Sequence, residues 1–194
     1  MQSTIQYTKW HATRLVTARR LRACLLATFA NSEVSEDPTA LFKLSYGLFV
    51  LTAKDGEKDN GCITNTAVQV ASMPTQISVS VQKGNLTREM IEKTGKFNVS
   101  VLTEDVPYDV IRHFGMQSGR DVNKFENCKD SPRSANGILY IPKYTNAYFS
   151  AKVISKQDLG THVQFIGEVT ESKTLSDKPS CTYAHYHAEI KPKA

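Results

Sequence analysis

The sequence predicts a mainly β protein with short helices, folded as a closed or nearly closed antiparallel barrel. Apolar and polar residues alternate with period two through about six segments, which is typical of strands with one buried face. The two expected helices are short and do not alternate regularly with the strands. The sequence has no G-x-G-x-x-G turn of the kind that opens a dinucleotide-binding α/β domain. Many strands with few helices therefore favour a barrel.

The first half of the expected barrel contains a hairpin. Residues 44–51 carry apolar side chains on both faces, so this strand should be central and buried. The Asp55-Gly56 step within the polar stretch 54–59 predicts a tight turn. The chain should then return as one strand over 61–72. Met73-Pro74 ends this strand, because proline cannot donate to a strand ladder.

Caps and turns mark the remaining elements. Asn85 is a typical N-cap and Gly95 a typical C-terminal stop, so a helix is expected over 86–94. Gly115 closes a second short helix that begins at Pro107. Further strands are expected at 77–82, 97–101, 148–155 and 162–170, with a turn at 158–160 and an irregular polar stretch over 117–136.

The excess of positive charge lies in the first part of the chain. The net charge is +5, from 24 Lys and Arg against 19 Asp and Glu. Five basic residues precede the first acid, Glu33, and the other 19 balance the 19 acids. A balanced domain offers no basic face for phosphate backbones, so no nucleic acid partner is expected. No apolar run approaches the roughly 20 residues that span a bilayer, so a soluble protein without membrane partners is expected.

The four cysteines lie far apart in the sequence and form no C-x-x-C pair. A zinc site is not expected from this spacing, and no other metal site is expected. Nothing in the sequence indicates secretion, so we interpret the cysteines as reduced thiols in an intracellular compartment.

Residues 1–40 are expected to form a basic extension and linker, followed by one folded domain over 41–194. Residues 1–32 contain no acid, several Ser and Thr, and a partly helical apolar pattern, which resembles an organelle transit peptide. A disordered extension or an over-long start is the alternative. The expected location is the cytoplasm, or an organelle such as the mitochondrion if the extension is a transit peptide.

One face of the expected strand over 61–72 carries small or amide side chains, namely Asn65, Ala67, Gln69 and Ala71. Small residues let a planar ring approach the backbone, and amides can hydrogen-bond the polar edge of a ring such as isoalloxazine. A solvent-facing strand side would carry the same residues. This strand alone therefore leaves both interpretations open.

The segment Lys83-Gly84-Asn85-Leu86-Thr87 joins a strand end to a helix N-terminus. Free backbone N–H groups and the positive end of the helix dipole favour a phosphate at such a place. Lys83 can add a positive charge, and Asn85 or Thr87 can add hydrogen bonds. A solvated lysine beside a capping asparagine is the alternative. A ring-compatible strand and a phosphate-compatible turn, one strand apart, match the two ends of one FMN.

The sequence resembles the flavin reductase-like, FMN-binding split-barrel proteins. It is most similar to the group that includes flavoredoxin and the flavin reductase domains found with rubredoxin. The likeness covers about residues 41–186 and rests on an ordered set of motifs. These are Phe42-Lys43-Leu44-Ser45-Tyr46-Gly47-Leu48, residues 60–70, Lys83-Gly84-Asn85-Leu86-Thr87, residues 114–121, Lys124-Phe125, His162 with residues 165–169, and Thr182-Tyr183-Ala184-His185-Tyr186.

The resemblance implies a Greek-key-like split β-barrel over 41–194 that binds FMN as a homodimer, with the flavin near the subunit interface. It also assigns residues to the two ends of the cofactor. Asn65, Thr66 and Gln69 would line the isoalloxazine, Ser72 would lie near the ribityl–phosphate end, and Lys83, Asn85 and Thr87 would hold the phosphate.

The same resemblance gives roles to a loop and to one histidine. Ser118, Gly119 and Arg120, together with Lys124 and Phe125, would flank the cofactor or the dimer contact. His162, the only tentative catalytic residue, would contact the nicotinamide or the reduced flavin.

The implied activity is that of an NAD(P)H-dependent FMN reductase. Hydride would pass from nicotinamide C4 to flavin N5, and the electrons would go to free flavin, rubredoxin or another small redox protein. Two alternatives stay open: an FMN electron carrier without its own reductase activity, and a barrel that binds another small ligand without a redox role.

Overall fold

The structure, a computed structural model, describes residues 37, 39–126 and 131–193. The expected targeting extension therefore lies almost entirely outside the described residues, and the expected domain boundary at residue 41 stays a prediction. Within the described ranges, no helix has the length and the apolar character needed to cross a membrane.

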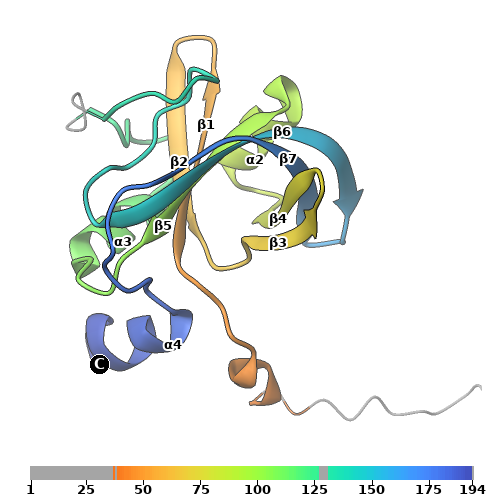
Figure 1. Cartoon of the computed structure of the whole chain (residues 1–194). Coiled ribbons are helices and arrows are strands. Elements are labelled where there is room, and N and C mark those ends of the chain that lie inside the picture. Colours follow the sequence, from red (N-terminus) through yellow and green to blue (C-terminus); the bar gives the residue numbers. More distant parts are fainter. Residues whose placement is uncertain (1–36, 38, 127–130, 194) are drawn as a thin grey trace, which may run out of the picture. The chain divides into compact units, whose positions relative to one another are not determined.

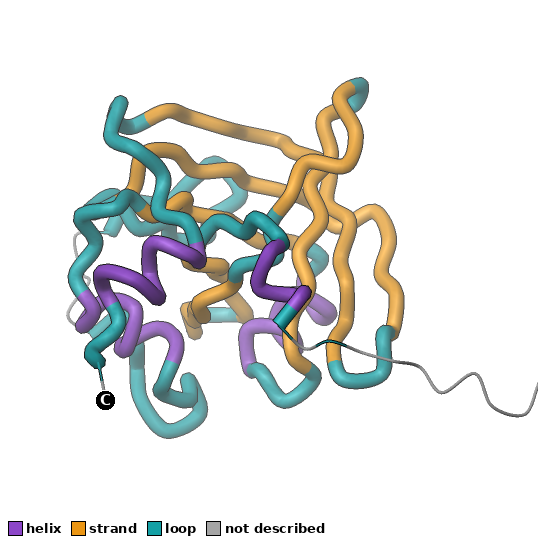
Figure 2. Tube along the Cα trace, turned by 90° about the horizontal axis from the view of Figure 1, so that it is seen from below, coloured by secondary structure: helices purple, strands orange, loops and turns teal. Residues whose placement is uncertain are grey.

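One antiparallel sheet of seven strands forms the body of the domain, in the order β2-β1-β5-β6-β7-β4-β3. The strands curve around in space and do not form a flat layer (Figures 1 and 2). The predicted mainly β fold with few short helices is confirmed. The strands are β1 Phe49–Asp55, β2 Lys58–Thr64, β3 Val68–Ser72, β4 Thr75–Gln82, β5 Lys96–Leu102, β6 Thr145–Asp158 and β7 His162–Thr174.

The described helices are short. Helix α2 has the predicted bounds: the Asn85 side chain accepts a hydrogen bond from the Thr87 amide, and Gly95 stops the helix with a φ of 68°. The C-terminal helical turns were not predicted. The helices are η1 Ala40–Lys43, α2 Leu86–Thr94, α3 Tyr108–Gly115, α4 Tyr183–His185 and the π-helix η2 Tyr186–Ile190.

The prediction of one strand over 61–72 is wrong. The chain leaves β2 after Thr64 and enters β3 at Val68, and these two strands lie at opposite ends of the strand order. The connecting residues 65–67 therefore cross from one end of the sheet to the other. The prediction failed because the period-two pattern runs through the crossover with no Gly or Pro to interrupt it.

The Thr66 side chain joins the two ends of the sheet. Its hydroxyl donates to the Ser80 carbonyl at 3.0 Å and accepts from the Ser80 amide at 3.0 Å. Ser80 lies on β4 beyond Val68↔Ser78, where the ladder between β3 and β4 begins. At this point the hydrogen bonds of the Thr66 side chain replace backbone pairing between strands. The crossover is therefore joined to β4 through a side chain and not through a continuous strand ladder.

The strand β1 is buried on both faces, as expected for a central strand, although it begins at Phe49 and not at residue 44. Leu51 belongs to an apolar cluster with Phe97, Phe165 and Ile91 of α2. Val50 points to the other face and packs in a second cluster, under α3 and the C-terminal turns. The two faces of β1 thus connect the barrel interior to the layer of helices.

The segment 131–141 is fastened to the sheet through buried amide and hydroxyl groups. The Asn98 side-chain nitrogen donates to the Ser134 hydroxyl at 2.7 Å and to the Ile138 carbonyl at 3.0 Å. The Thr52 hydroxyl donates to the Leu139 carbonyl at 2.6 Å. These bonds fix one wall of the pocket described below.

Candidate functional site

The crossover between β2 and β3 holds two of the residues that the sequence assigned to the flavin ring. Asn65 and Thr66 are both half-buried. The Thr64 and Thr66 hydroxyls are 3.0 Å apart and hydrogen-bonded, and the Thr66 amide donates to the Thr64 hydroxyl at 3.3 Å. The backbone at Asn65 is therefore held between two threonines and the bond to Ser80.

The strand β3 does not keep the alternation that the sequence pattern suggested. The pairing with β4 shifts register between Gln69 and Ala71, and the Gln69 amide nitrogen donates to the Ala71 carbonyl at 3.1 Å. Gln69 also lines a small hollow of about 130 Å³ with Ala67 and Val68. Asn65, Gln69 and Ala71 thus do not form one continuous strand face. Gln69 lies beside the crossover, at the edge of the sheet.

Ser72 lies at the far end of β3, opposite Thr75 at the start of β4. Lys83 follows directly after Gln82, at the other end of the same strand. A strand of this length separates the two residues by roughly 25 Å. Within one subunit the structure does not bring Ser72 near the turn from β4 into α2, to which the sequence analysis assigned the phosphate.

The turn from β4 into α2 carries an exposed lysine and open space. The Lys83 ammonium is 2.7 Å from the Asp158 carboxylate, and the two side chains are 44% and 65% exposed. This ion pair holds the pKa of Asp158 below its usual value, chiefly through the hydrogen bond from Lys83. A Cβ added at Gly84 would have no atom within 4 Å, so the turn faces free space. Arg88 supports the turn from below, because its guanidinium Nε donates to the Lys83 carbonyl at 3.0 Å.

His162 lies next to this turn, at the start of β7. It pairs with Gln82 across the sheet, and its Nδ1 is 2.9 Å from the Thr161 hydroxyl. The Lys83 amide donates to the Thr161 carbonyl at 3.1 Å. His162 is exposed and lies beside the turn from β4 into α2.

The Thr87 side chain is fully buried and cannot face a ligand directly. Its hydroxyl accepts a hydrogen bond of 3.0 Å from the buried Asn60 amide. Gly119 packs against the same amide so closely that a Cβ would lie 2.1 Å from the Asn60 oxygen. Asn60 therefore links the first turn of α2 to the loop that contains Gly119. Sequence reasoning missed Asn60 as a site residue, because its pattern shows only a polar residue in a hairpin strand.

Arg120 makes a second contact between this loop and α2. Its guanidinium is 2.6 Å from the Glu89 carboxylate on α2. The hydrogen bond from Arg120 is the main cause that lowers the pKa of Glu89. The Ser118 hydroxyl accepts from the Arg120 amide at 3.1 Å, which shapes the turn before it. Arg120 is thus brought to α2, and Ser118 shapes the turn that carries it.

Lys124 and Phe125 end this loop and are both buried. The Lys124 ammonium donates to the carbonyls of Gly61 at 2.9 Å and Phe114 at 2.8 Å. The Phe125 ring packs at 5.5 Å from the Phe114 ring. We refer to residues 118–125 as the α2-contact loop. Its last two side chains point into the protein and anchor it.

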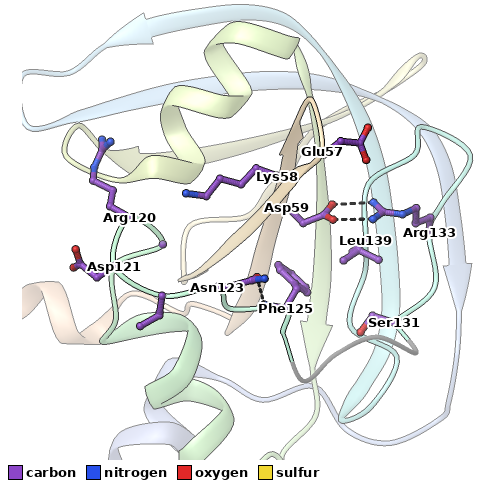
Figure 3. A pocket seen from close by; sticks show the side chains of 12 residues that line it. Glu57, Lys58, Asp59, Arg120, Asp121, Asn123, Phe125, Ser131, Arg133 and Leu139 are labelled. Atoms are coloured by element: carbon purple, nitrogen blue, oxygen red, sulfur yellow. Dashed lines mark hydrogen bonds and ion pairs between the residues drawn. The ribbon is translucent and has the colours of Figure 1, made fainter.

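A pocket of about 660 Å³ lies behind the α2-contact loop. Figure 3 shows Arg120 and Asp121 on one side and the Asp59–Arg133 pair on the other. That pair is bidentate, with nitrogen–oxygen distances of 2.8 and 2.7 Å. The α2-contact loop therefore contacts helix α2 and also lines this pocket.

Three comparisons place the chain among known proteins. The family model described as "Flavin reductase like domain" matches residues 41–192. The high molecular weight rubredoxin of Moorella thermoacetica is 42% identical over 151 residues, which cover 78% of this chain and 66% of that protein. The ferric-chelate reductase (NAD(P)H) of Archaeoglobus fulgidus is 34% identical over 157 residues, which cover 81% of this chain and 92% of that protein. The crystal structure of flavoredoxin from Methanosarcina acetivorans superposes with a TM-score of 0.64 at 19% identity, covering 74% of this chain and 76% of that one.

We predict that Gly119→Ala destabilises the protein by about 1–3 kcal/mol, because the new methyl group would overlap the buried Asn60 amide. Gly84→Ala is the matched control, since its methyl group meets only open space, and its effect should stay within about 0.5 kcal/mol. Denaturant unfolding of both variants measures the difference. Equal stability of the two variants would show that the α2-contact loop does not press on Asn60.

Proposed function

The chain belongs to the flavin reductase-like family, and we propose that it is an FMN-binding oxidoreductase that takes electrons from NADH or NADPH. The family match confirms the fold class and the family that the sequence predicted. The residues that hold the cofactor, the donor nucleotide, the acceptor and the oligomeric state are parts of the proposal.

One observation carries the assignment of the flavin site. The crossover at Asn65 and Thr66 is tied to Ser80, and the open turn at Lys83 follows three residues later on the same strand. This spacing corresponds to roughly 10 Å along β4. The strand β4 therefore places two features close together. One is the half-buried crossover, which suits a ring, and the other is the cationic N-terminus of α2, which suits a phosphate.

The residues present fit FMN at both ends. At the phosphate end, Lys83 is exposed, Gly84 leaves room, and the first amides of α2 point out of the helix. A bound phosphate would compete with Asp158 for the Lys83 ammonium. At the ring end, the backbone at Asn65 and the Gln69 amide offer donors and acceptors beside a small hollow.

Bound FMN supplies the redox chemistry, since it accepts hydride from a nicotinamide and passes electrons on. The chain binds and orients it: Thr66 fixes the backbone against which the ring lies, and Lys83 with α2 holds the phosphate. His162 lies beside the phosphate turn and can donate a hydrogen bond to a bound nucleotide. No acid–base pair is required of the protein for such a transfer.

Two relatives support particular acceptors. The relative named a high molecular weight rubredoxin favours a rubredoxin, and the one named a ferric-chelate reductase favours an iron chelate. The chain spans 66% of the length of the first and 92% of the second. We propose a small diffusible acceptor: a redox protein such as rubredoxin, a ferric chelate or free flavin. A cytoplasmic location, or an organelle if residues 1–40 target the chain, belongs to the same proposal.

A second copy of this chain is the proposed partner at the strand β3. This edge strand and the turn after it expose apolar side chains: Val68 is 58% and Val70 50% accessible on β3, and Met73 is 95% accessible in the turn. An exposed apolar sheet edge is a template for further association, and soluble proteins normally cover it. Gln69 and the crossover lie directly beside these residues, so a homodimer through β3 would cover the ring end of the flavin site.

We predict that the purified protein binds FMN and that NADH or NADPH bleaches the flavin absorbance under anaerobic conditions. Adding rubredoxin, a ferric chelate or free FMN should then restore the oxidised spectrum if that molecule is an acceptor. Bound FMN that dithionite reduces but neither nucleotide reduces would identify an electron carrier. No FMN binding at all would refute the proposal and favour a barrel for another ligand.

We predict that Lys83→Gln weakens FMN binding about tenfold or more, because it removes a charged partner of the phosphate. Riboflavin lacks the phosphate, so its affinity should not change. Lys93→Gln is the control: it also removes a lysine paired with an aspartate, Asp55 at 2.7 Å, but at the C-terminal end of α2. Quenching of flavin fluorescence gives both dissociation constants. An equal effect on FMN and riboflavin would contradict a phosphate site at this turn.

We predict that Val70→Glu converts the protein from dimer to monomer, since a charge would be buried at the proposed β3 contact. Leu159→Glu replaces a leucine of similar exposure, 48% against 50%, in the turn between β6 and β7, and should leave the dimer intact. Sedimentation velocity measures the state of each variant. A wild-type monomer, or a dimer that Val70→Glu leaves unchanged, would exclude this interface.

A further inference from the structure

Lys124 is a lysine whose ammonium is directed into the protein. Only 3% of the residue is exposed. Its Nζ donates to the Gly61 carbonyl at 2.9 Å and the Phe114 carbonyl at 2.8 Å. The resemblance suggested a place beside the cofactor, but these bonds turn the charged group toward β2 and α3.

The two acceptors explain how the protein tolerates this buried charge. Phe114 lies in the last turn of α3, where carbonyls have no helical partner and the helix dipole favours a cation. Hydrogen bonds from a charged donor are stronger than neutral ones, and they offset the cost of taking the ammonium out of water. Burial still lowers the pKa of Lys124.

The backbone of Lys124 is held as well. The His113 Nε2 lies 2.7 Å from the Lys124 carbonyl. One end of the α2-contact loop is therefore attached to α3 through both the side chain and the main chain of Lys124, and to β2 through Gly61.

The other end of the α2-contact loop reaches the phosphate end of the proposed flavin site. Gly119 packs on the Asn60 amide, which donates to the Thr87 hydroxyl in the first turn of α2. Arg120 pairs with Glu89 in the same helix. Asn60 precedes Gly61, whose carbonyl Lys124 holds. The ammonium and the first turn of α2 are thus connected through two adjacent residues of β2.

We propose that Lys124 is a positioning residue for the phosphate end of the flavin site: by holding Gly61 and Phe114 it sets the place of Asn60, Gly119 and Arg120 against α2. This inference rests on the proposed function, because it concerns the same FMN site. Its ammonium faces the Gly61 and Phe114 carbonyls, so the proposed role is not one of direct contact with the cofactor. It acts through the α2-contact loop and the adjacent strand.

The test compares the FMN and riboflavin affinities of the Lys124→Met variant with those of the wild type. Methionine keeps about the length of the lysine side chain and removes the N–H donors of its ammonium. We expect a folded variant with the FMN dissociation constant raised about ten- to a hundredfold, as a small displacement of a binding group produces, and an unchanged riboflavin dissociation constant. Lys152→Met, at an exposed position of β6, is the control and should bind FMN as the wild type does. Lys124→Arg keeps donors for both carbonyls and should recover part of the lost affinity.

A double mutant separates positioning from a general loss of stability. If Lys124 acts through Arg120, the effect of Lys124→Met on FMN affinity should be smaller in an Arg120→Ala background, so the two losses should not add. A folded Lys124→Met protein with wild-type FMN affinity, an equal loss for riboflavin, or fully additive losses would overturn the inference.

If Lys124→Met fails to fold, His113→Ala loosens the same attachment from its other side. A raised FMN dissociation constant in that variant supports the inference, and an unchanged one overturns it. Failure of the wild type to bind FMN would instead count against the proposed function. Binding by the wild type together with undisturbed binding by the variants counts only against the role of Lys124.

Discussion

Thr66 hydrogen-bonds both backbone groups of Ser80, and this contact closes a sheet whose two end strands do not pair there. Backbone N–H and C=O groups that are removed from water need partners, and a hydroxyl can serve as donor and acceptor at once. Because the crossover is held in this way, β3 can turn outward as an edge strand while β2 stays in the barrel. The position of Asn65, and with it the proposed ring site, depends on this side chain.

The phosphate end is organised differently, since its polar groups are satisfied by partners from distant parts of the chain. Asp158 pairs with Lys83, Glu89 with Arg120, and Asn60 with Thr87. Asn60 and Thr87 are buried, whereas Lys83, Asp158, Glu89 and Arg120 keep access to solvent. A site of this kind needs few groups that touch the ligand and many that hold them in place, which is how binding geometry is kept precise.

Local signals in the sequence were enough for the elements that are stabilised locally. Asn85 and Gly95 fixed the ends of α2, because capping is a contact between near neighbours. The crossover was missed because Asn65 to Ala67 continue the alternation of the strand before them. Thr87 was assigned to the ligand by its position after a cap, but a fully buried side chain depends on tertiary packing that no spacing reveals. The place of Lys124 beside the cofactor or the dimer contact stays a prediction, and the direction of its side chain depends on the Gly61 and Phe114 carbonyls, which no local pattern reveals.

The pairing of β4 with β7 joins residues as far apart in the sequence as Gln76 and Glu168. The Asn60 side-chain amide contacts both Thr87 and Gly119, which lie on two later segments of the chain. Contacts of such long sequence separation are slow to form, because the loops between them must be closed first. The proposed flavin site is therefore complete only when segments far apart in the sequence have come together. A ligand that recognises only this finished state adds its binding energy to the stability of the whole fold. In a newly made chain, binding of the cofactor would thus mark the chains whose domain has folded completely.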